Sequence, residues 1–191
     1  MCECICMTRI LANSGALCHH KAVSYSARTA VVHNTVMFLK GNKNLRASSY
    51  LASELVGVIR SDGELPTLNS ENTLVTFVPR GHKGVLKYGV DQSELLALEV
   101  SNAMGVPFFV GLTRVRGGKE QKRLSAAQRA KNVKKLYSPT EDIAAVDGRY
   151  VIIVDDVVTT GASMAACVSY LVRAGARRVI ALSLASTEEN K

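Results

Sequence analysis

Tryptophan is absent from the 191-residue chain, and aromatic residues make up only 5% of it. Proteins that bind single-stranded nucleic acid usually stack the bases on aromatic side chains, and this chain has few to offer. No apolar run is long enough to cross a bilayer. The first residues also lack the apolar core of a secretory signal. We therefore expect a cytoplasmic protein without a membrane span.

Two common nucleotide-binding motifs are also missing. The chain has no G-x-x-x-x-G-K-[ST] sequence, and no G-x-G-x-x-G sequence follows a predicted strand. These absences disfavour a P-loop NTPase and a dinucleotide-binding fold. With 47% hydrophobic and 21% charged residues, the composition is that of an ordinary globular protein. The length suits one compact domain with a small appendage.

Cysteine is scarce, and four of the five cysteines crowd the N-terminus. A disulfide framework is not expected in a chain of this size without a secretory signal. Thiolates and imidazoles suit zinc, so the candidate zinc ligands are Cys4, Cys6, Cys18 and His20. Their spacing lacks the usual paired C-x-x-C knuckles, and a loosely attached start of the chain is the alternative. We predict a Cys/His-bearing arm over residues 1–24 and the main domain over residues 25–191.

Positive charge is in excess, with 24 basic residues, 16 acidic residues and a net charge of +8. Nine basic residues and one acid lie between residues 113 and 137, so this stretch carries the whole excess. Such an excess indicates an anionic partner, which would be a nucleotide, a phosphosugar or nucleic acid. A solvated basic helix or loop is the alternative interpretation.

The order of predicted elements indicates a parallel α/β sheet flanked by helices. Helical periodicity covers residues 45–59, 92–104 and 162–174. Apolar runs typical of buried strands cover residues 74–78, 106–112, 150–154 and 179–185. Residues 25–40 fit a helix and a strand equally well. Strands that alternate with helices in this way form parallel sheets that are buried on both faces.

The most informative segment runs from Val151 to Ser163 and reads V-I-I-V-D-D-V-V-T-T-G-A-S. Ligands of open parallel sheets bind beyond the carboxyl ends of the strands, where Asp155 and Asp156 stand. The T-T-G turn leads into a helix N-terminus, whose free N–H groups and dipole favour a phosphate. The two carboxylates would then accept hydrogen bonds from sugar hydroxyls or help to hold Mg²⁺. The alternative is that Asp155 only caps the helix.

This segment resembles the motif with which type I phosphoribosyltransferases bind phosphoribosyl pyrophosphate (PRPP): four apolar residues, two acids and T-T-G. The resemblance implies a sheet of that family's kind with a flexible hood beside the site. It also implies that the acidic pair contacts the ribose and that the following loop holds the 5′-phosphate. The implied PRPP-binding residues are Asp155, Asp156, Val157, Val158, Thr159, Thr160, Gly161, Ala162, Ser163, Pro79, Arg80 and Gly81. Asp155 and Asp156 would hold Mg²⁺, mainly through the bound PRPP.

A second resemblance is to ComF-type competence proteins. It rests on K-E-Q-K-R-L-S at residues 119–125, Arg129, N-V at residues 132–133, V-P at residues 78–79 and G-V-D-Q at residues 89–92. The family has arginine where this chain has Tyr88, and F-N where it has Val90 and Asp91. The implied hood residues are Lys119, Gln121, Arg129 and Asn132. The implied catalytic residues are Asp155, Asp156, Arg80 and Lys119.

Together the resemblances imply an enzyme that binds PRPP with Mg²⁺ and transfers its phosphoribosyl group to an unknown acceptor. They also imply a role in DNA uptake, with DNA or proteins of the uptake machinery as partners. A homodimer would suit an α/β domain of this size. Two alternatives stay open, namely a PRPP-sensing regulator without catalysis and a DNA-binding module, because no acceptor pocket can be read from the sequence.

Overall fold

A parallel sheet of four strands forms the centre of the protein. The computed structural model describes residues 11, 13–25, 45–81, 85, 86, 89–115 and 135–187. The strands are β1 (Ala16–Tyr25), β2 (Thr73–Phe77), β5 (Tyr150–Val158) and β6 (Arg178–Thr187). Their order in the sheet is β1-β6-β5-β2, and every neighbouring pair is parallel. The central strand β5 is therefore paired on both sides, which fixes the position of the residues at its carboxyl end.

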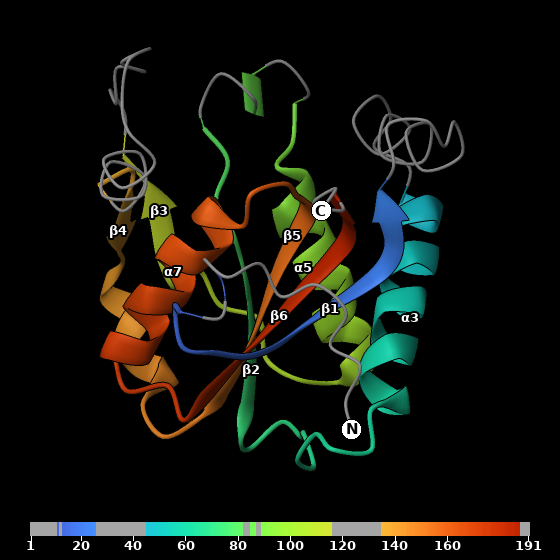
Figure 1. Cartoon of the computed structure of the whole chain (residues 1–191), viewed down its shortest axis with the longest axis horizontal. Helices are drawn as coiled ribbons and strands as arrows, with labels where there is room; N and C mark the ends of the chain where they lie inside the picture. Colours follow the sequence, from blue (N-terminus) through green and yellow to red (C-terminus); the bar gives the residue numbers. More distant parts are fainter. Residues whose placement is uncertain are drawn as a thin grey trace.

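Helices cover both faces of this sheet (Figure 1). They are α3 (Leu45–Ser61), α5 (Gln92–Met104) and α7 (Ala162–Arg173). Side chains of α3 and α5 share one apolar layer with Ile152 and Val154, whereas α7 shares the other with Val151 and Ile153. Successive residues of a strand point to opposite faces, so the apolar run of β5 is buried on both sides. The predicted fold class is confirmed. None of the helices described is long and apolar enough to cross a bilayer.

Most elements lie close to where the sequence pattern predicts them. Helix α5 has the predicted bounds, and Gly105 follows it in the left-handed conformation, with φ of 67°. Strand β5 continues beyond the predicted end at Val154 as far as Val158. This extension is relevant to the site, because Asp155 and Asp156 belong to the strand itself, and pairing with β6 at Asp155 and at Val157 holds the backbone on either side of Asp156.

The prediction of a strand over residues 106–112 is wrong. Only an isolated bridge forms there, between Phe108 and Val75. Val75 donates its N–H to the carbonyl of Pro107 at 2.9 Å, and Phe109 donates to the carbonyl of Val75 at 3.0 Å. Proline lacks the N–H that a longer ladder needs, which explains the short pairing. The chain then forms an antiparallel pair and a 3-10 helix: β3 (Leu112–Arg114), β4 (Tyr137–Pro139) and η1 (Glu141–Val146).

Strand β1 is not predicted by the sequence pattern, and the domain boundary expected at residue 24 falls inside it. The strand pairs in parallel with β6 from Ala16 to Tyr25, so the sheet begins at least nine residues before the predicted start of the domain. Edge strands commonly carry polar residues, and these obscure the apolar pattern. The sequence of β1 includes His19, His20 and Lys21.

The predicted zinc ligands are only partly within the described residues. Cys18 lies in β1 with 4% of its surface exposed and belongs to the apolar layer that α3 and α5 cover. Cys4, Cys6 and the side chain of His20 lie outside the described part of the chain. Among the residues that are described, no three His, Cys, Asp or Glu side chains gather in a way that could hold a metal ion. The zinc site stays a prediction.

Gln92 offers a test of the packing at the start of α5. The residue is buried, and neither of its amide atoms has a hydrogen-bond partner in the described structure. An unpaired buried amide costs about 1–3 kcal/mol, and methionine has nearly the same shape without the polar atoms. We expect Gln92→Met to raise the free energy of unfolding by about 1 kcal/mol and Tm by about 2–4 °C. Thermal unfolding followed by circular dichroism measures the change, and a lower Tm would contradict the account.

Candidate functional site

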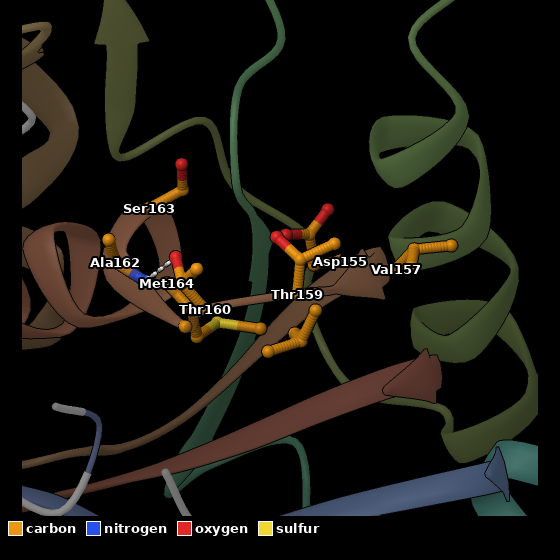
Figure 2. Close-up of a pocket in the computed structure, with 9 residues that line it drawn as sticks. Asp155, Val157, Thr159, Thr160, Ala162, Ser163 and Met164 are labelled. Atoms are coloured by element: carbon orange, nitrogen blue, oxygen red, sulfur yellow. Dashed lines mark hydrogen bonds between the residues drawn. The ribbon is translucent and has the colours of Figure 1, made fainter. Parts of the chain in front are cut away.

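The carboxyl end of β5 and the start of α7 enclose a pocket of about 60 Å³ (Figure 2). Its lining contains most of the segment predicted to hold the ribose and the 5′-phosphate. The lining residues are Asp155, Val157, Val158, Thr159, Thr160, Gly161, Ala162, Ser163 and Met164. A cavity needs only about 10–15 Å³ to hold one water molecule. The pocket therefore has room for a small group of several atoms, such as a phosphate.

The turn between β5 and α7 brings backbone N–H groups to this pocket. Gly161 has φ of 71°, in the left-handed region that favours glycine. Helix α7 begins at Ala162, its N-cap Gly161 has no side chain to cap it, and the N–H of Ala162 makes one long hydrogen bond to Oγ1 of Thr160 at 3.4 Å. The positive end of the helix faces this turn and favours an anion there. The hydroxyls of Thr159, Thr160 and Ser163 belong to the same lining. Hydroxyls, a helix N-terminus and a glycine turn are together suited to a phosphate.

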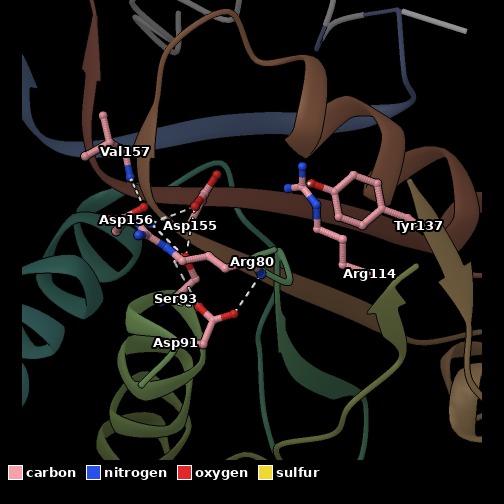
Figure 3. A network of polar contacts seen from close by, with 8 residues as sticks. All are labelled: Arg80, Asp91, Ser93, Arg114, Tyr137, Asp155, Asp156 and Val157. Carbon is pink, nitrogen blue, oxygen red and sulfur yellow. Dashed lines mark hydrogen bonds and ion pairs between the residues drawn. The ribbon is translucent and has the colours of Figure 1, made fainter. Parts of the chain in front are cut away.

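The two aspartates at the end of β5 have different surroundings. Asp155 lines the pocket, and its Oδ1 accepts the hydroxyl of Ser93 at 2.9 Å. Asp156 is 4% exposed and forms an ion pair and hydrogen bond with Arg80 (Figure 3). Burial, and then the negative charge of Asp156, raise the pKa of Asp155 well above its usual value, although the Ser93 hydroxyl opposes the shift. Asp155 therefore borders the pocket and has a hydroxyl partner, whereas Asp156 is paired with a cation.

Arg80 follows β2 and is held by carboxylates from two elements. Besides its pair with Asp156, its Nε lies 4.0 Å from Oδ1 of Asp91. Although burial opposes the charged form, the carboxylate of Asp156 raises the pKa of Arg80 above its ordinary value. The predicted loop of Pro79, Arg80 and Gly81 is therefore tied to the end of β5.

Asp91 and Ser93, at the start of α5, were not among the predicted site residues. Asp91 is the N-cap of the helix and accepts the backbone N–H of Ser93 at 3.0 Å. It also accepts the backbone N–H of Arg80 at 2.7 Å. The sequence did carry a signal for the cap, because Asp91 and Glu94 have the spacing of a capping box. It carried none for the contact between Ser93 and Asp155, which joins residues 62 positions apart.

Arg114 and Tyr137, from β3 and β4, form a second polar group in Figure 3. The guanidinium of Arg114 donates to the phenol oxygen of Tyr137 at 3.3 Å and lies 5.5 Å from the ring centre. Burial raises the pKa of Tyr137 to about 12. A Cβ atom added at Gly81 would lie 3.5 Å from Nε of Arg114, so this arginine is next to the loop that carries Arg80. Arg114 therefore adds a cation beside that loop, which the prediction missed.

The predicted hood residues Lys119, Gln121, Arg129 and Asn132 lie outside the described residues. Their predicted roles, and the catalytic role of Lys119, stay predictions. The segments that frame them are described, since β3 ends at Arg114 and β4 begins at Tyr137. These two strands pair with each other.

Comparison with known proteins agrees with this geometry. The profile of the phosphoribosyl transferase domain matches residues 87–191. DNA utilization protein YhgH of Salmonella typhimurium (strain LT2) is 30% identical over 160 residues, which cover 83% of this chain and 69% of the relative. DNA utilization protein YhgH of Salmonella typhi is 34% identical over 106 residues, which cover 55% of this chain and 45% of the relative. The chain thus spans about half the length of the second relative.

A solved structure, that of the allosteric regulatory enzyme of purine biosynthesis, is 26% identical to the chain with a TM-score of 0.48. The match covers 73% of this chain and 25% of that one. The domain profile spans more than half of the chain, and relatives named DNA utilization proteins are in accord with the ComF-type resemblance. The chain belongs to the phosphoribosyl transferase domain family.

Proposed function

We propose that the chain binds PRPP together with Mg²⁺ and transfers its phosphoribosyl group to an acceptor, with release of pyrophosphate. The observation that carries the proposal is the pocket between β5 and α7, which combines one carboxylate with hydroxyls and a helix N-terminus. A sugar phosphate needs these groups together, because its phosphate takes N–H and O–H donors and its hydroxyls take carboxylate acceptors.

We assign each part of PRPP to the residues whose chemistry suits it. Thr159, Thr160 and Ser163 would bind the 5′-phosphate, and Asp155 would accept hydrogen bonds from the ribose hydroxyls. Arg80, in the loop after β2 and paired with Asp156, would face the pyrophosphate. Each anionic end of PRPP would thus meet a site that favours negative charge, and the ribose between them would meet a carboxylate.

The acidic pair fits Mg²⁺ when the ligand supplies further oxygen atoms. Magnesium in such sites is commonly held by one or two carboxylates together with substrate phosphates. Asp155 and Asp156 are two adjacent carboxylates, and no third metal-binding side chain joins them within the described residues. When bound, the ion would supply positive charge that stabilises the departing pyrophosphate.

The proposed reaction is a displacement at C1 of the ribose. The bond from C1 to the pyrophosphate oxygen breaks with its electron pair, and a bond from the acceptor nucleophile to C1 forms. The protein would neutralise the leaving group with Arg80 and exclude water, which competes as a nucleophile. Exclusion of water is the role we propose for the hood residues Lys119, Gln121, Arg129 and Asn132.

The cellular role that we propose is in DNA utilization, after the name that the relatives carry.

The proposed transfer reaction is tested by the release of pyrophosphate from PRPP by the full chain, measured with a panel of nucleobases, ammonia and amines. Release that depends on one acceptor class supports the transferase. Binding of PRPP without release by any acceptor would overturn the transfer step and leave a PRPP sensor. Oligonucleotide binding that weakens steeply with salt and ignores PRPP would favour a DNA-binding module.

Replacement of Arg80 tests the assignment of the pyrophosphate end. Arg80→Ala removes a charge-assisted contact, and we expect the affinity for pyrophosphate to fall about tenfold or more. The affinity for ribose 5-phosphate should change less than about threefold, because we assign its phosphate to the start of α7. Calorimetric titrations with both ligands measure the difference. Arg178→Ala is the control, since Arg178 is exposed at the opposite end of the sheet. Equal losses for the two ligands would contradict the assignment.

A further inference from the structure

The start of α5 touches both halves of the proposed PRPP site. Asp91 uses both carboxylate oxygens there: Oδ2 accepts the backbone N–H of Arg80 at 2.7 Å, and Oδ1 accepts the backbone N–H of Ser93 at 3.0 Å. One carboxylate thus joins the loop after β2 to the first turn of α5. Asp91 is 8% exposed, so water has little access to replace either bond.

Ser93 continues this connection to the end of β5. Its hydroxyl donates to Oδ1 of Asp155 at 2.9 Å. The backbone N–H of Asp156 is shared between the same Oδ1, at 2.9 Å, and the Ser93 hydroxyl, at 3.3 Å, so Ser93 provides the side-chain contact to this carboxylate. Ser93 is fully buried. A buried hydroxyl that both donates and accepts has a fixed orientation, and so does the carboxylate that it contacts. Figure 3 shows Asp91 and Ser93 at the start of α5, with Asp155, Asp156 and Arg80 close by.

We propose that Ser93 and Asp91 are positioning residues with separate tasks. Ser93 holds the Asp155 carboxylate in the orientation that receives the ribose, and Asp91 holds the backbone of the loop that presents Arg80 to the pyrophosphate. This inference rests on the proposed function. Neither side chain contacts the ligand itself, and each acts through the residue that it holds.

The choice of aspartate at position 91 supports this assignment. Both of its oxygens accept from backbone N–H groups, and both acceptors are therefore in use. Asparagine has the same shape and caps helices equally well, but it offers only one acceptor oxygen. In Asp91→Asn, the amide nitrogen must face one of the two N–H groups. Because the cap within α5 is local, the bond to the more distant Arg80 is the one we expect to be lost.

The test compares Ser93→Ala with Asp91→Asn in calorimetric titrations of the full chain, with Mg²⁺ and either ribose 5-phosphate or inorganic pyrophosphate as the probe. Ser93→Ala should weaken ribose 5-phosphate about three- to tenfold and pyrophosphate less than twofold. Asp91→Asn should show the opposite order. Ser93→Thr, which restores the hydroxyl, should recover the affinity for ribose 5-phosphate.

Ser101→Ala is the matched control, because Ser101 is also buried in α5 but donates its hydroxyl to the carbonyl of Val106 at 2.6 Å, away from the site. It should leave both affinities unchanged. If Ser93→Ala resembles this control, or if each variant weakens both ligands equally, the positioning roles are overturned while the proposed function stands. If the unmodified chain binds neither ligand, the proposed function itself fails, and this inference fails with it.

Discussion

Replacing both aspartates, as Asp155→Asn/Asp156→Asn, should lower the affinity for PRPP about a hundredfold or more. Asp155→Asn weakens the acceptor assigned to the ribose hydroxyls, and Asp156→Asn breaks the charge-assisted contact that holds Arg80. Each such contact is worth about 1.5–3 kcal/mol. Two such losses correspond to a factor of at least about a hundred. Both side chains keep their size, but Asp156→Asn breaks the buried pair with Arg80, so a lower Tm is expected and circular dichroism checks that the variant is folded. Calorimetry with PRPP and Mg²⁺ measures the affinity.

The control for this variant is a second pair of adjacent acids. Glu141 and Asp142 are exposed in η1, outside the pocket lining. Glu141→Gln/Asp142→Asn changes the net charge by the same amount and should leave the affinity for PRPP within about twofold of the unmodified chain. If the two double variants lose affinity equally, the loss at Asp155 and Asp156 is an effect of net charge, and the ribose assignment is wrong.

Gly161→Val should abolish phosphate binding and also weaken the fold. Gly161 has φ of 71°, and a β-branched residue in this left-handed region is strained by about 1–2 kcal/mol. The strain would displace the turn whose N–H groups and hydroxyls line the pocket. We expect no saturable binding of ribose 5-phosphate and a lower Tm, measured by calorimetry and circular dichroism.

Gly148→Val separates strain from function. Gly148 has a nearly identical φ of 69° and lies two residues before the start of β5, at the other end of the strand from the pocket. A Cβ atom there meets nothing within 4 Å, so the cost of the substitution is the backbone strain alone. Its Tm should fall much as in Gly161→Val, while ribose 5-phosphate still binds. Loss of binding in both variants would point to general destabilisation instead.

The sequence predicts those elements whose pattern reports directly on burial. Helices α3, α5 and α7 have apolar periodicity, and β2, β5 and β6 have continuous apolar runs because helices cover both faces of the sheet. The apolar pattern does not predict strand β1, because this edge strand contains His19, His20 and Lys21 and therefore lacks a continuous apolar run. The expected strand at residues 106–112 fails for a local reason, because Pro107 interrupts the ladder.

The candidate site likewise has one part that the sequence predicts and another part that it does not. The segment from Asp155 to Ser163 is contiguous, so its strand, acids and turn can be recognised as one motif, and all of it except Asp156 lines one pocket. Ser93 contacts Asp155 only because α5 packs beside the end of β5. The pair of Arg80 with Asp156 likewise joins residues 76 positions apart. Contacts of this range follow from the tertiary packing, which local periodicity does not contain.

The central claim is that the pocket between β5 and α7 is a PRPP site, and calorimetric titration of the unmodified chain with PRPP tests it most directly. With Mg²⁺ present, the account predicts saturable binding of one PRPP per chain, weaker binding when Mg²⁺ is removed, and competition by both ribose 5-phosphate and pyrophosphate. Absence of binding in the presence of Mg²⁺, or binding that neither fragment of PRPP displaces, would contradict it.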